Sequence, residues 1–150
     1  MDAATVAEAL RQILHGEDFD PPTKLRGMKP EVATRVPEGV PYSIATNLWH
    51  CDYWNRLWLA RLTGAKRPAK NIWAEDWQIP TESEWSETVE RFMSNLELAR
   101  EIALREPLEH AMKSDEVAIK TLNQIAVHTA YHVGQIALLK RILRAEKENN

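Results

Sequence analysis

The sequence has little of several features that would assign a protein to a class directly. Its 150 residues contain one cysteine, Cys51, so an internal disulfide is excluded and a reducing compartment is favoured. No run of about 18 apolar residues occurs, so we expect no membrane-spanning helix. The net charge is only -3 and no lysine- or arginine-rich block stands out, which argues against a nucleic-acid partner. The chain begins Met1-Asp2 with no basic segment before an apolar stretch, so we expect no signal peptide and a cytoplasmic protein.

What the sequence does contain is 44% hydrophobic residues arranged with a helical period. A chain of this length predicts one domain, residues 1–150, with a substantial core. No stretch alternates with period two for long enough to predict a sheet, so the fold class is all-α. Four amphipathic segments predict a helical bundle. They cover residues 3–14, 43–63, 81–105 and 115–146.

The ends of these helices carry recognisable signals. Asp2 and Ser43 are plausible N-caps, and Gly64 is a plausible stop. Residues 81–84, Thr-Glu-Ser-Glu, have the capping-box pattern. Five prolines predict a loop over residues 17–41, with at most a short helical turn near residues 30–35. Residues 65–80 read as a connection in which two tryptophans fold back onto the bundle, namely Trp73 and Trp77.

Three histidines are the candidate functional residues. His128 and His132 are four residues apart in a predicted helix, so both imidazoles project from one face. His50 lies in an apolar stretch of another predicted helix. A single buried histidine is usually satisfied by a carbonyl or a water molecule. Three of them in one small core would all be satisfied by a shared divalent metal ion that keeps one coordination position open.

For several residues near these histidines, the sequence allows two interpretations. Gln135 and Gln124 would bind a ligand or form ordinary hydrogen bonds between helices, and Tyr131 is expected to pack rather than reach the site. Asn47 and Trp54 would either line the mouth of a pocket or simply pack.

Other nearby residues are expected to be structural. Cys51 is expected to be a small core residue, and Asp52 lies on the opposite side of its helix from His50. Gly134 costs up to about 1 kcal/mol in the middle of a helix, so it predicts the close approach of another helix.

The segment from His128 to Ile136, His-Thr-Ala-Tyr-His-Val-Gly-Gln-Ile, followed by Leu138-Leu139-Lys140-Arg141, resembles the C-terminal signature of the DinB/YfiT-like superfamily. Residues 43–50, preceded by Pro37 and Gly39, resemble the start of that family's second helix and include its first histidine. Asp76-Trp77, Pro80, Glu84 and Trp85 resemble the family's approach to its third helix. The order and lengths of the segments agree over nearly the whole chain.

The resemblance implies a four-helix bundle with an up-down-down-up path, and a homodimer, as in many members of the family. It implies a divalent metal ion, most often nickel or zinc, bound by His50, His128 and His132. Several relatives transfer low-molecular-weight thiols to small-molecule electrophiles, so a metal-dependent thiol transferase with a thiol cosubstrate is one expected function. A metal-dependent hydrolase is an alternative.

Two non-enzymatic alternatives also stay open at this point. One is a non-catalytic, stress-related metal-binding bundle that acts through dimerisation. The other is a binder of haem or a small ligand that uses one histidine.

Overall fold

The computed structural model describes residues 2–149, and every regular element in that part of the chain is a helix. The predicted all-α class is therefore confirmed. Four of the helices are long: α1 (Ala3–His15), α3 (Ile44–Thr63), α5 (Glu82–Ala103) and α6 (Asp115–Glu148). Three are short: η1 (Pro22–Gly27), α2 (Pro30–Thr34) and α4 (Ile72–Glu75). None of the helices within residues 2–149 is long and apolar enough to cross a lipid bilayer.

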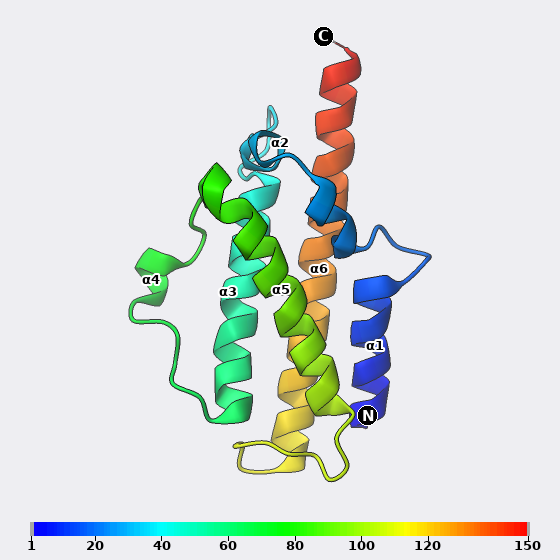
Figure 1. The fold of residues 1–150 in the computed structure, drawn as a ribbon, viewed down its shortest axis with the longest axis vertical. Helices are drawn as coiled ribbons and strands as arrows, with labels where there is room; N and C mark the ends of the chain where they lie inside the picture. Colours follow the sequence, from blue (N-terminus) through cyan, green and yellow to red (C-terminus); the bar gives the residue numbers. More distant parts are fainter. Residues whose placement is uncertain (1, 150) are drawn as a thin grey trace.

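The four long helices lie side by side (Figure 1), with α3 packed against α5 and α6, and α1 packed against the same two helices. In Figure 1, α1 and α6 run upward while α3 and α5 run downward. All four share one hydrophobic core. Its largest fully buried side chains include Phe92, Leu10, Leu48, Leu96, Leu122 and Ile125.

The helix ends follow from the capping residues. The backbone N–H of Thr5 donates to Asp2 Oδ1 at 2.8 Å, and that of Thr46 donates to Ser43 Oγ at 3.0 Å. Thr81 forms a capping box at the start of α5. Gly64 ends α3 with φ of 74°, a left-handed conformation that glycine adopts without a steric penalty. Each of these caps matches its prediction, and the long helices end within two residues of the predicted limits.

Two short helices were not predicted, η1 and α4. The one that bears on function is α4, which lies beside α3 in Figure 1. Its last residue, Glu75, accepts hydrogen bonds from two side chains of α3: Trp49 Nε1–H to the backbone oxygen at 3.0 Å, and the Tyr53 hydroxyl to the carboxylate at 3.2 Å. These contacts hold α4, and the residues that follow it, against the middle of α3.

A buried polar contact joins α3 to α5. The fully buried Asp52 carboxylate accepts hydrogen bonds from Arg91 Nε at 2.7 Å and Asn95 Nδ2 at 2.8 Å, and Arg56 Nε lies 3.2 Å away. Asp52 therefore faces α5 and not the histidines on α6, as predicted. Its charge is tolerated in the core because two cations and an amide replace its hydration.

We expect Arg91→Met to lower the free energy of unfolding by about 2 kcal/mol, because a buried carboxylate loses a charged hydrogen-bond donor. Urea denaturation measures the change. Arg105→Met is the matched control, since the Arg105 pair with Glu109 is exposed and should matter little. An Arg91→Met protein as stable as the wild type would show that Asp52 does not depend on this ion pair.

Candidate metal centre

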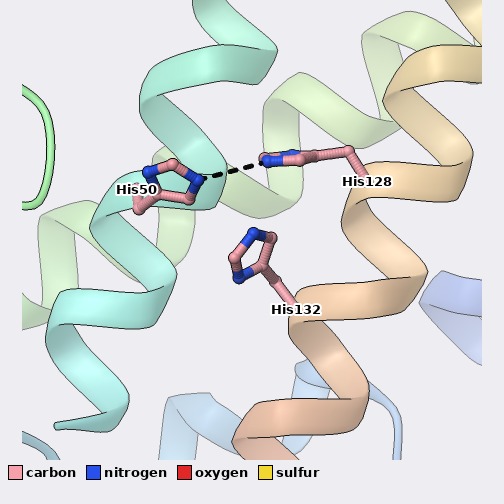
Figure 2. A group of neighbouring side chains, drawn as sticks. All are labelled: His50, His128 and His132. Atoms are coloured by element: carbon pink, nitrogen blue, oxygen red, sulfur yellow. Dashed lines mark hydrogen bonds between the residues drawn. The ribbon is translucent and has the colours of Figure 1, made fainter. Parts of the chain in front are cut away.

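The centre lies between α3 and α6, where three imidazoles meet. His50 comes from the middle of α3, while His128 and His132 project from one face of α6, one turn apart. Figure 2 shows the three rings pointing into the same space between the two helices. His50 and His132 are buried and His128 is half-buried. The predicted convergence of these three residues is therefore present in the fold.

The ring nitrogens are placed as metal ligands would be. The Nε2 atoms of His50 and His128 are 3.3 Å apart (dashed line in Figure 2). Two nitrogens bound tetrahedrally at a normal zinc distance would be about 3.3 Å apart. One nitrogen from each of the three rings lies within 4.8 Å of the other two. The donor set fits a divalent metal held by three neutral imidazoles, which leaves further coordination positions for a small molecule.

The second nitrogen of each ring contacts a protein group. His50 Nδ1 lies 2.6 Å from Asp76 Oδ1, and His132 Nδ1 lies 3.2 Å from Asn47 Oδ1. His128 Nδ1 is 3.9 Å from the sulfur of Cys51. An Nδ1–H that donates to a carboxylate or amide oxygen leaves the Nε2 lone pair free, so these partners select the tautomer that binds a metal.

The Asp76 carboxylate is the most strongly held of these partners. Besides His50, its Oδ1 accepts the backbone N–H of Trp77 at 2.8 Å, and its Oδ2 accepts Trp54 Nε1–H at 3.0 Å. Three donors therefore fix the position of one carboxylate, which in turn orients His50. The sequence places Asp76 in a stretch that resembles the family's approach to its third helix, but it does not predict the contact with His50, because the two residues are 26 positions apart and no periodicity connects them.

Trp77 covers one side of the centre. Its indole stacks on the His50 ring with centroids 3.7 Å apart, and Tyr42 stacks on Trp77 at 4.5 Å. Trp77 has φ of 57°, which is rare for a large side chain and costs on the order of 1–2 kcal/mol. The prediction that Trp73 and Trp77 both fold back is correct for Trp77 and wrong for Trp73. Trp73 is 97% exposed, and the one-turn helix α4 that carries it buries none of its residues.

Burial keeps two of the imidazoles neutral. It lowers the pKa of His128 to about 4, and the neighbouring His50 acts in the same direction. It also lowers the pKa of His132 to about 4, with a further contribution from His128 and His50, partly offset by Gln135 and Asp76. Neutral imidazole is the form that ligates metals, so His128 and His132 need no deprotonation at neutral pH.

Cys51 lies close to the centre without belonging to it. Its side chain is fully buried, and burial raises the pKa of the thiol to about 12. The sulfur contacts Thr129 Oγ1 at 3.8 Å and stays protonated at neutral pH. Cys51 is therefore the core residue that was predicted.

Of the other residues that the sequence singled out near the histidines, some contact the site and others are exposed. Asn47 and Trp54 contact the site through His132 and Asp76 respectively. Gln124 and Tyr131 line a groove beside His128, and Tyr131 is 63% exposed, so its predicted packing role is wrong. The close approach predicted for Gly134 is wrong within this chain, because an added Cβ there would meet nothing within 4 Å.

A comparison with protein families matches residues 23–136 to the DinB superfamily. This match covers more than two thirds of the chain and includes all three histidines. No curated protein and no solved structure matches the chain.

Replacing Asp76 with asparagine keeps the size of the side chain and removes its charge. Loss of this orienting carboxylate should weaken zinc or nickel binding about 10- to 100-fold. Titration calorimetry against a competing chelator measures the affinity. Asp18→Asn, at an exposed carboxylate, is the control and should bind metal like the wild type. Unchanged affinity in Asp76→Asn would mean that the carboxylate does not support the site.

The depressed pKa values predict how the metal-free protein responds to acid. Histidines in the unfolded chain have a pKa near 6.5, whereas the pKa of His128 and of His132 in the folded protein is about 4. Between these values the unfolded state binds more protons, so the free energy of unfolding should fall as the pH is lowered. Denaturation in EDTA from pH 7 to 5 measures the slope. A His128→Gln/His132→Gln variant should show a shallower slope, and an equal slope would contradict the assignment.

Proposed function

The chain thus belongs to the DinB superfamily, and we propose that His50, His128 and His132 hold a nickel or zinc ion in a metal-dependent enzyme. The observation that carries the proposal is the convergence of three imidazole nitrogens within 4.8 Å, two of them neutral because of burial. For the scaffold we propose the family's four-helix bundle with its up-down-down-up path, in agreement with the directions of the four long helices.

The proposed reaction is the transfer of a low-molecular-weight thiol to a small-molecule electrophile. Held by the three imidazoles, a divalent metal ion would lower the pKa of a bound thiol or water molecule and so would supply a nucleophile at neutral pH. The protein's own residues orient and enclose the site. Asp76 holds the His50 ring, Asn47 holds the His132 ring, and Trp77 keeps water from one face of His50. The thiol is the substrate class expected of the family, and hydrolysis by bound water is the alternative.

We also propose a homodimer. Phe19 and Leu138 are 61% and 57% exposed, and they lie with Gly134 along a groove beside α6. This face carries large exposed apolar side chains around Gly134, and an added Cβ at Gly134 would meet nothing within 4 Å. Both features support the packing of a second copy of the chain on this face.

Metal analysis and a thiol-transfer assay test the enzyme proposal. Protein purified without a metal-affinity tag should contain about one zinc or nickel ion per chain, a ratio expected for a three-histidine site. His128→Ala should lose the metal and all activity with a panel of bacillithiol, mycothiol and glutathione against a chloronitrobenzene electrophile. His15→Ala is the matched control, because His15 pairs with Glu97 far from the centre and should retain both properties.

The outcomes separate the alternatives. Metal without thiol transfer, but with hydrolysis of an ester panel, would replace the transferase by the hydrolase. Metal with neither activity would favour the non-catalytic bundle. Wild-type protein that binds no divalent metal would overturn the proposal altogether.

A further inference from the structure

A groove adjoins the candidate metal centre on the outer side of α3 and α6. It has a volume of about 710 Å³ and reaches the histidine triad only through His128. We call it the α3–α6 groove and define it by its lining residues: Trp54, Trp58, Lys120, Asn123, Gln124, Val127, His128 and Tyr131.

The residues around the three histidines leave the α3–α6 groove as the route by which a small molecule reaches the centre. On the His50 side, Trp77 stacks directly on the ring and Tyr42 stacks on Trp77. His50 is 8% exposed and His132 only 3%. His128 is the least buried of the three, and it is the one that lines the groove. A small molecule therefore approaches the centre past His128.

The walls of the groove are aromatic and apolar. Trp54 and Trp58 from α3 have ring centroids 5.6 Å apart, and the Trp58 and His128 rings are perpendicular with centroids 5.0 Å apart. Trp54 is held in place by its hydrogen bond to Asp76. On the α6 side, Val127 is 61% exposed and Tyr131 63% exposed. Trp58 itself is only 7% exposed, so a flat apolar ring would gain apolar contact from it and stacking from the half-buried Trp54 and the exposed Tyr131.

The positive charge of the groove, on Lys120, lies at the end that is farther from the three histidines. Among the described lining residues, Lys120 is the one charged side chain, and no carboxylate lines the groove. Lys120 pairs with Glu116 at 2.6 Å, but both side chains are more than 70% exposed, so the pair is weak and a ligand carboxylate competes for the lysine. Lys120 and His128 are eight residues apart on α6, which corresponds to about 12 Å along the helix.

From these observations we propose that the α3–α6 groove binds the acceptor substrate, a flat aromatic carboxylate of about two rings in length. Its ring system lies between Trp58 and the Val127–Tyr131 side, its carboxylate pairs with Lys120, and its other end faces His128. This proposal rests on the proposed function, since it names the substrate class of the same centre.

Titration calorimetry with 2-naphthoate tests the groove independently of any reaction. The neutral analogue 2-naphthalenemethanol is the matched ligand. We expect 2-naphthoate to bind both zinc-loaded and EDTA-treated protein, and more tightly than the alcohol. Lys120→Gln should weaken naphthoate binding about threefold, the value of an exposed ion pair, and leave the alcohol unchanged. Lys147→Gln, near the far end of α6, is the control and should change neither.

A second variant tests the walls without disturbing the core. Val127→Glu places a negative charge on an exposed groove position, so it should weaken naphthoate binding about fivefold or more by like-charge repulsion. Val32→Glu, at an exposed position of α2, is the control and should bind normally. Tyr131→Ala, at a 63% exposed position of the same wall, should weaken both ligands about fivefold through loss of aromatic contact, with circular dichroism confirming that the variant is folded.

The results distinguish this proposal from the proposed function. If the protein binds naphthoate in the groove but no metal, the groove stands and the metal enzyme fails. If the wild-type protein binds metal but not naphthoate, the groove proposal is wrong. It is also wrong if the Val127→Glu variant binds naphthoate as tightly as the wild type does. If Val127→Glu instead converts a dimer to a monomer in sedimentation and naphthoate does not bind, the groove is an interface between copies, and the proposal is equally overturned.

Discussion

The structure depends on the packing of α3 against α6 with three imidazoles between them. Buried imidazoles need hydrogen-bond partners or a metal ion, because an unsatisfied polar group in the core costs on the order of 1–3 kcal/mol. Here the outer nitrogens contact Asp76, Asn47 and Cys51, while two Nε2 atoms face each other at 3.3 Å. Two neutral nitrogens at that distance satisfy one another only if one of them carries a proton. A shared cation satisfies both, which is the physical reason to read the cluster as a metal centre.

The connection between α3 and α5 is shaped around this cluster. Glu75 anchors the short helix α4 to α3, so that Asp76 reaches His50 and Trp54 at once. Trp77 then adopts a left-handed backbone conformation and stacks on His50. Strain of this kind persists where the surrounding contacts over-determine the conformation, and it is concentrated at functional sites. The strained backbone at Trp77 therefore accompanies a fixed orientation of the His50 ring, one face of which the indole covers.

Sequence reasoning succeeded where the physics is local. Helix caps at Asp2, Ser43 and Thr81 involve residues three apart, and the apolar period marks the buried face of each long helix. It missed α4, because one turn of helix has too few residues to show a period. It also misjudged Trp73 and Tyr131, since hydrophobic type alone does not say whether a side chain packs against another helix or stays exposed. The close approach expected at Gly134 was wrong because the cost of a glycine within a helix does not say whether another helix lies beside it.

The amino-acid sequence is sufficient to establish that the chain is helical, where its long helices begin and end, and that His128 and His132 share a face. These properties depend on neighbours within about one helical turn. The apolar helical setting of His50 made it a third candidate and resemblance to a family supported it, but only the tertiary structure brought its Nε2 to 3.3 Å from that of His128. Three further features are seen only in the tertiary structure: the contact of Asp76 with His50, the stacking of Trp77 on His50, and the groove beside His128. Each of these depends on contacts between segments distant in the chain, and no local pattern encodes such distances.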